Sequence, residues 1–116
     1  MSVAEIAQSL VDLCRAGKFE QPYDTLFAEN ARSVEGTGES VEGLAAIKVK
    51  SAEWGENNVV HGFTVNGPFV GTDQFAVHFV LEITPKRSGE KMSFVEVGVY
   101  AVADGKIVEE KFLYGA

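Results

Sequence analysis

The chain of 116 residues is long enough for one hydrophobic core but too short for two, so a single domain over residues 1–116 is predicted. Hydrophobic residues make up 46% and charged residues 23%, which is typical of soluble globular proteins. The formal net charge is −7, and Lys and Arg form no cluster. This balance argues against nucleic acid or an anionic membrane as a partner, because binding phosphate groups requires clustered cations.

Cysteine content and the N-terminus indicate a cytoplasmic protein. Cys14 is the only cysteine, so no internal disulfide can form, and a reducing compartment is expected. The first residues lack the basic and apolar regions of a signal peptide, and no apolar stretch approaches the roughly 20 residues of a membrane helix. The two histidines lie far apart in sequence, without the spacing of a metal site. We therefore expect neither a metal nor another cofactor.

The N-terminal half shows the spacing of helices. Ser2 and Glu5 form a capping box ahead of apolar residues at helical spacing, and Gly17 is a typical stop. A shorter second helix is predicted over residues 19–29 and a third over residues 41–54.

After residue 58 the pattern changes to the alternation of β-strands. Strands are predicted over residues 31–35, 59–66, 74–84, 93–103 and 107–114. Gly67-Pro68 predicts a bend or bulge, because proline cannot donate a hydrogen bond to a central strand pair. Asp104-Gly105 predicts a tight hairpin turn between the last two strands.

The order of elements indicates an α+β domain, with three N-terminal helices packed on a mostly antiparallel sheet. Both faces of the strand at 93–103 are apolar, and the helices can cover only one of them. The other face carries Val95, Val97 and Val99. An uncovered apolar sheet face is typical of a subunit contact, so a homodimer through this face is predicted.

Three segments resemble the SnoaL-like group of the NTF2-like superfamily. They are LFAENARSVE at 26–35, EGLAAI at 42–47 and VYAVADGKIVE at 99–109, and the resemblance extends over nearly the whole chain. It implies a cystatin-like cone, in which a strongly curved sheet wraps the first helix and leaves a pocket for a small molecule at its open end. The superfamily includes isomerases, polyketide cyclases, dehydratases, ligand binders and protein-binding modules, so the resemblance leaves the activity open.

Ketosteroid isomerases, which share this fold, imply roles for two glutamates. Their general-base Asp follows a segment similar to residues 26–31, and the equivalent position here is Glu35. They also use a protonated Asp in a late strand, within one residue of Glu96, together with a Tyr on the first helix. Leu10 occupies the position of that Tyr.

Glu96 is a candidate on physical grounds as well, because it interrupts an apolar strand. Such a carboxylate must find a partner, take up a proton or face a wet pocket, and a raised pKa would suit a proton donor. The alternative is a structural glutamate bonded to a His, Tyr or Trp side chain. His78 would form an acid–base pair with Glu96 if the strand register places it near Gly98, whereas a shift of one residue would put the two on opposite faces.

Other residues are interpreted as pocket walls or surface. Trp54, Tyr100 and Phe63 are expected to line the pocket with Leu10. Glu110, next to Lys111, is interpreted as part of a solvated strand edge.

Two functions stay open from the sequence. The first is a small isomerase-, cyclase- or dehydratase-type enzyme acting on a carbonyl compound, with Glu35 as base and Glu96, with or without His78, as proton donor. The second is a non-catalytic dimeric module that binds a small molecule or another protein. A pocket of at least about 300 Å³ reached by either glutamate would favour the first function. A cone filled by Trp54, Phe63 and Phe79 would favour the second.

Overall fold

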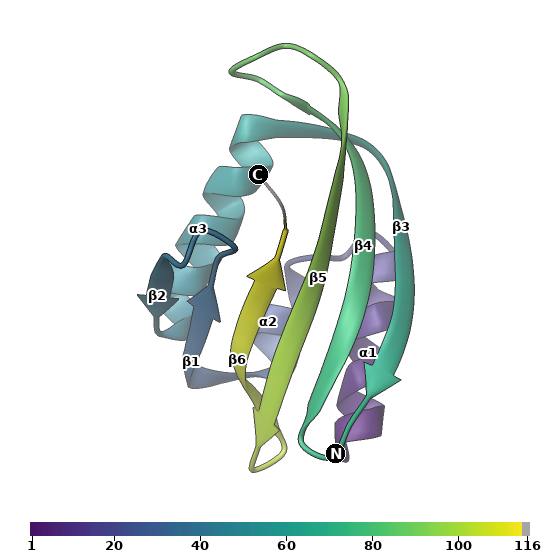
Figure 1. Ribbon diagram of the computed structural model, residues 1–116. Coiled ribbons are helices and arrows are strands. Elements are labelled where there is room, and N and C mark those ends of the chain that lie inside the picture. Colours follow the sequence, from purple (N-terminus) through teal and green to yellow (C-terminus); the bar gives the residue numbers. More distant parts are fainter. Residues whose placement is uncertain (115–116) are drawn as a thin grey trace.

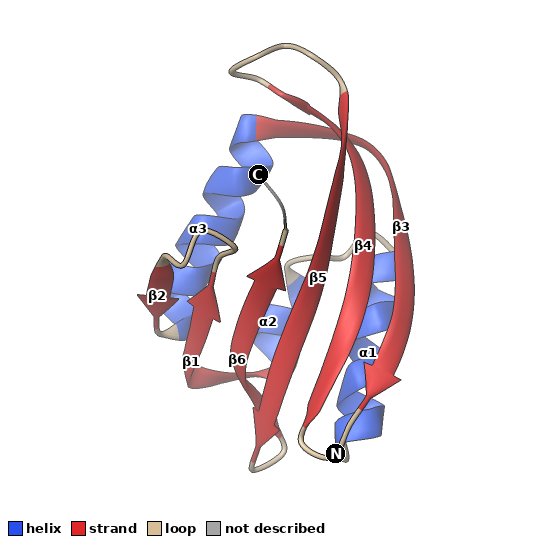
Figure 2. Cartoon of the chain, viewed as in Figure 1, coloured by secondary structure: helices blue, strands red, loops and turns tan. Residues whose placement is uncertain are grey.

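The computed structural model describes residues 1–114 and shows helices packed on one face of a curved sheet (Figure 1). Its elements are α1 (Val3–Arg15), α2 (Gln21–Thr25), β1 (Phe27–Val34), β2 (Ser40–Glu42), α3 (Leu44–Asn57), β3 (Asn58–Val70), β4 (Gln74–Pro85), β5 (Met92–Ala103) and β6 (Lys106–Leu113). The strand order is β2-β1-β6-β5-β4-β3, and neighbours run antiparallel except for the parallel pair β1 and β6. This is the predicted α+β cone (Figure 2).

Helix α1 supplies one side of the hydrophobic core. The capping box is confirmed: the Glu5 backbone N–H donates to Ser2 Oγ at 3.1 Å, and the Ser2 backbone N–H donates to the Glu5 carboxylate at 2.9 Å. The apolar face packs mainly beneath β3 and β4. Its buried residues are Ile6, Ala7, Leu10, Val11 and Cys14. None of the helices within residues 1–114 is long and apolar enough to cross a membrane.

The second and third helices, Gln21–Thr25 and Leu44–Asn57, differ at both ends from the predicted ranges 19–29 and 41–54. The second helix ends at Thr25 instead of residue 29, because Phe27 already pairs with β6. The third helix begins at Leu44 instead of residue 41, because Ser40–Glu42 pairs with β1 as a short edge strand. Gly43, with φ of 91°, separates that strand from the helix.

The predicted turns of the sheet are confirmed. Asp104 and Gly105 have φ of 52° and 74°, the two positive values that a type I′ hairpin turn requires. The register of β3 against β4 shifts between Asn66 and Phe69, which places the irregularity at the predicted Gly67-Pro68 bend.

The register of β4 against β5 assigns the side chains to two faces. Phe79 pairs with Glu96, and Phe79 belongs to the buried core, so both side chains point to the helix side, called the inner face here. Val95, Val97 and Val99 alternate with them on the outer face. Within residues 1–114 no helix covers that face (Figure 2), and Val95 is 49% exposed.

Candidate functional site

A continuous chain of hydrogen-bonded polar side chains runs along the inner face, between helices α2 and α3 and strands β1 and β6. We call it the polar chain. Its members, in order of contact, are Tyr23, Glu110, Ser33, Lys50, Glu35 and Tyr114. It begins at Tyr23, which contacts the buried carboxylate of Glu110, and ends at the half-buried Tyr114 just after β6. In a hydrogen-bonded network of this kind, each side chain is oriented by its neighbours.

Glu110, the second member of the polar chain, is only 1% exposed. Its carboxylate accepts hydrogen bonds from the Tyr23 hydroxyl at 3.2 Å and the Ser33 hydroxyl at 2.9 Å. Burial raises the pKa of Glu110 to about 7, although the hydrogen bond from Ser33 and the charge of Lys50 act in the opposite direction. The prediction of a solvated edge is therefore wrong, because pairing with Tyr100 puts Glu110 on the inner face.

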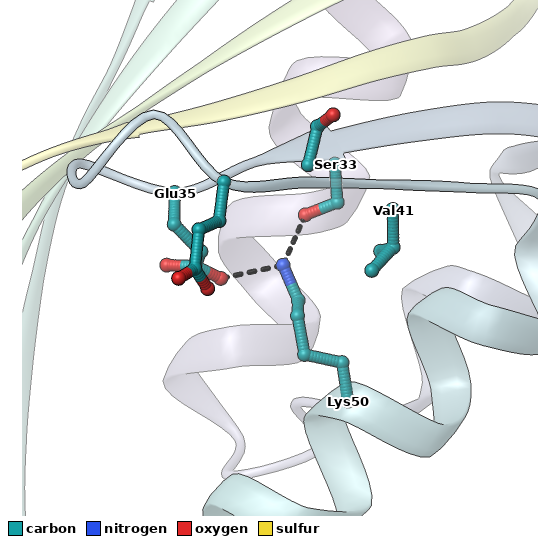
Figure 3. Close-up of a pocket in the computed structure, with 6 residues that line it drawn as sticks. Ser33, Glu35, Val41 and Lys50 are labelled. Carbon is teal, nitrogen blue, oxygen red and sulfur yellow. Dashed lines mark hydrogen bonds and ion pairs between the residues drawn. The ribbon is translucent and has the colours of Figure 1, made fainter.

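The centre of the polar chain is Lys50, which reaches the sheet from α3. It lies three residues after Ile47, a fully buried residue on the same side of the helix. The Lys50 ammonium donates to Ser33 Oγ and to Glu35 Oε1, each at 2.5 Å (Figure 3). Its Nζ also lies 5.7 Å from the ring centroid of Phe112.

A small pocket opens at Glu35. Its volume is about 80 Å³, and its lining residues are Ser33, Glu35, Glu39, Ser40, Val41 and Lys50 (Figure 3). This falls short of the roughly 300 Å³ that typical small-molecule sites provide. It is also about half the roughly 150 Å³ of a cavity that holds benzene. The pocket therefore fits the head group of a ligand and not a whole drug-sized molecule.

Glu96 lies on the inner face close to the polar chain but does not line this pocket. Its pKa is raised to about 7, mainly by burial and then by the negative charges of Glu35 and Glu110, while Lys50 lowers it. Within residues 1–114 it makes no side-chain hydrogen bond, and no buried polar side-chain atom there is left unsatisfied. Its carboxylate oxygens therefore reach solvent.

His78 lies on the other face of the sheet. Strand β4 pairs His78 with Val97, so the register is the one that separates His78 from Glu96. The His78 Nδ1 atom instead lies 3.0 Å from the side-chain nitrogen of Asn66. The acid–base pair of His78 with Glu96 is thus not formed.

Two of the expected pocket walls belong to the core. Leu10 is 2% exposed and packs in the main hydrophobic cluster. Tyr100 is 4% exposed and stacks on Phe75, with ring centroids 4.9 Å apart. Its ring lies over Gly98, where an added Cβ would come within 2.8 Å of the Tyr100 hydroxyl. This close approach explains the glycine in the middle of β5.

The other expected walls, Trp54 and Phe63, are 39% and 37% exposed. Neither lines the pocket at Glu35. Phe63 packs edge-on against Phe19, and Phe79 lies in the core. The cone is thus not filled by the three aromatic side chains together.

Five members of the polar chain were not among the residues that the sequence singled out as a site: Tyr23, Ser33, Lys50, Glu110 and Tyr114. One signal could have found Glu110, since it alternates with Phe112 and Tyr114 in β6 and the segment after it. A carboxylate in phase with two aromatic residues indicates an inward-facing position. Within residues 1–114 no group of three or more His, Cys, Asp or Glu side chains could hold a metal ion.

Comparisons with known proteins agree with the fold. A family model for the SnoaL-like domain matches residues 1–114. A Mesorhizobium loti protein, proposed as a SnoaL-like polyketide cyclase and also labelled a carbohydrate phosphatase, has 39% sequence identity and a TM-score of 0.95, with coverage of 98% of this chain and 100% of that one. No curated protein matches the chain significantly.

More distant structures share the fold alone. A Xanthomonas campestris protein of unknown function with a cystatin-like fold has 14% identity and a TM-score of 0.79, with coverage of 100% and 92% of the two chains. A proposed isomerase from Bacillus subtilis has 18% identity and a TM-score of 0.75, with coverage of 97% and 86%. The match of the family model over nearly the full length and the 39% identity establish that this chain belongs to the SnoaL-like family.

Proposed function

We propose that the protein is an enzyme that moves protons on a small carbonyl compound by general acid–base catalysis. The observation that carries this proposal is the position of Glu35. Its carboxylate lines an open pocket, is oriented by Lys50 and Tyr114, and lies near a second carboxylate, Glu96, whose pKa is raised to about 7. Two carboxylates in different environments can divide the roles of base and acid.

In this mechanism Glu35 is the general base. It takes a proton from the carbon next to the carbonyl group, and the electron pair of the broken C–H bond moves toward the carbonyl oxygen. Glu96 does not line the pocket, so it acts as the proton donor through an intervening water. A carboxyl group with a pKa of about 7 suits this role because it is protonated in about half of the molecules near neutral pH. Isomerisation, ring closure of a polyketide and loss of water all contain such a step.

The charged residues that line the pocket favour a neutral carbonyl compound as substrate. Glu35 and Glu39 both line it, and the Lys50 charge is already paired with Glu35. A phosphate ester, which the second label of the Mesorhizobium loti protein suggests, would bring further negative charge against these carboxylates. A neutral carbonyl compound meets no such repulsion.

The proposal is tested by proton exchange in deuterated water. We expect the wild-type protein to exchange the α-protons of some members of a panel of small ketones and enones, followed by loss of their proton NMR signals. Glu35→Gln should reduce exchange at least about 100-fold, because the general base is lost, and Glu96→Gln should reduce it by a smaller factor.

The matched control for these variants is Glu53→Gln on the exposed surface of α3. It carries the same chemical change far from the pocket lining and should exchange at the wild-type rate. If Glu35→Gln and Glu96→Gln also keep the wild-type rate with every responsive compound, the catalytic proposal is wrong.

The small volume of the pocket favours a second candidate, a non-catalytic dimeric module that binds a ligand head group or another protein. We propose that the outer face of the sheet forms the homodimer contact. Val95 there is 49% exposed, beside Val97 and Val99. Large exposed apolar patches mark interaction sites.

The dimer can be tested at this face. Val97→Glu should convert the dimer to a monomer in light scattering coupled to size exclusion, because two carboxylates would be buried at the symmetric contact. Val49→Glu is the matched control, since Val49 is 59% exposed on α3 and away from the sheet face. A wild-type monomer, or a dimer that survives Val97→Glu, would contradict the proposed contact.

A further inference from the structure

We propose that Lys50 binds the carbonyl oxygen of the substrate and stabilises the negative charge that develops there. This inference rests on the proposed function and assigns the group that function still lacks, a cation at the oxygen. An enolate forms readily only where a positive or hydrogen-donating group meets its oxygen.

The hydrogen bonds of Lys50 leave one donor for a ligand. An ammonium group has three N–H donors. One is directed to Ser33 Oγ and one to Glu35 Oε1. Within residues 1–114 no other hydrogen bond of Lys50 is formed, and Lys50 lines the pocket, so the third N–H is available there.

The neighbouring hydroxyl cannot take this role. Ser33 donates its only proton to Glu110 at 2.9 Å and accepts from Lys50. Glu96 does not line the pocket at all. Among the six lining residues, Lys50 is therefore the one that offers both a positive charge and an unused donor.

The other members of the polar chain fix the position of Lys50. Glu110 fixes Ser33, and Tyr23 in turn donates to Glu110, so the acceptor of Lys50 is anchored in the buried layer. A donor fixed in this way before the substrate arrives needs no reorganisation when charge develops, and that arrangement is what electrostatic catalysis requires. In the proposed role of Lys50, Ser33, Glu110 and Tyr23 are positioning residues.

The step balances within the pocket. Glu35 takes the α-proton, the C–H electron pair forms a carbon–carbon double bond, and the former carbonyl π pair becomes the enolate charge on oxygen beside Lys50. Glu35 becomes neutral as the oxygen becomes negative, so the ammonium exchanges one anionic partner for another. Return of the proton to carbon reverses both changes.

The state after proton removal can be mimicked without turnover. Glu35→Gln carries a neutral amide in place of the protonated Glu35. The phenolate oxygen of 4-nitrophenol stands in for the enolate oxygen, with the ring lying outside the small pocket. Ionisation of 4-nitrophenol is followed by its visible absorbance. We expect Glu35→Gln to bind the phenolate about tenfold tighter than the phenol, seen as a decrease of about one unit in the apparent pKa of the bound probe.

The decisive comparison is the double variant Glu35→Gln with Lys50→Met, which removes both partners of the ion pair. It should lose the preference for the phenolate, and Glu35→Gln with Lys50→Arg should retain part of it because the positive charge remains. Circular dichroism and thermal unfolding show whether each variant is folded. Equal preference in Glu35→Gln and in the Lys50→Met double variant, or no preference in either, would overturn the role of Lys50.

The two proposals fail in different ways. If wild-type exchange depends on Glu35 but the phenolate preference does not depend on Lys50, the proposed function stands and the assignment of Lys50 is wrong. If the preference depends on Lys50 but the wild-type protein exchanges no α-proton, the enzyme proposal fails, and Lys50 is an oxyanion-binding residue of a ligand-binding protein.

Discussion

Raising the pH from about 5 to about 8 should lower the free energy of unfolding, because two buried carboxyl groups lose their protons. Each group should contribute about 2–3 kcal/mol to this decrease. These groups are Glu96 and Glu110, whose pKa values in the folded protein are both about 7, mainly because they are buried. In the unfolded chain both return to about 4.5. Between these values the folded state binds more protons than the unfolded state, so the contribution of these two groups to stability is greatest below about pH 4.5 and is lost as the pH rises through about 7.

The measurement is chemical denaturation at a series of pH values. Glu96→Gln and Glu110→Gln should each flatten the dependence, because a neutral amide does not titrate. The two effects should not add, since the carboxyl groups interact through their charges and titrate as a coupled pair. Glu53→Gln, on the exposed side of α3, should leave the slope as in the wild type. Wild-type and variant slopes that coincide would show that neither carboxyl group takes up its proton on folding.

Much of the sheet could be predicted from the sequence because its signals are local. The Asp104-Gly105 turn fixes the last hairpin, and alternating apolar residues identify β4 and β5. The short strand β2 could not be predicted in this way. Ser40–Glu42 is exposed or half-buried and is held by backbone pairing with β1, which apolar periodicity does not report.

The candidate site was harder to predict because it depends on register and bulges. The register of β5 against β6 shifts between Ala101 and Val102, so Ile107 and Glu110, three residues apart, both point inward. Simple alternation from Ile107 would have placed Glu109 inside instead. The face on which His78 lies was open for the same reason. The six-residue loop between β4 and β5 does not fix the register, and a shift of one residue would have placed His78 on the same face as Glu96.

Glu35 could be predicted as a site residue from the sequence, whereas Lys50 could not. The resemblance to ketosteroid isomerases implied that Glu35 is a site residue, and Glu35 lies in the lining of an open pocket. Lys50 has no such precedent in the segments compared. It lies beside the apolar stripe of α3, where a lysine normally extends into water. Its inward direction follows from the carboxylates of Glu35, just after β1, and Glu110 in β6, which only the tertiary fold brings together.

Lys50→Met should destabilise the protein by about 2–3 kcal/mol at about pH 8, less than the roughly 3–5 kcal/mol for breaking a fully buried pair because both side chains keep some contact with water. The side chains of Lys50 and Glu35 are 26% and 27% exposed. Loss of the ammonium leaves Glu35 without its ion pair, and it raises the pKa of Glu96 and Glu110 further, because Lys50 lowers both. At about pH 5 the cost should be smaller, since Glu96 and Glu110 are then protonated.

Lys48→Met is the matched control two residues earlier on the same helix. Lys48 pairs with Asp24, but these side chains are 45% and 60% exposed, so its loss should cost less than about 1 kcal/mol. Adding Glu35→Gln to Lys50→Met should restore part of the lost stability, because the unpaired charge is removed together with its partner. Equal costs for Lys48→Met and Lys50→Met, both independent of pH, would mean that the pocket carboxylates are solvated well enough to stay charged without Lys50. In that case the polar chain would not be the electrostatic centre of the site.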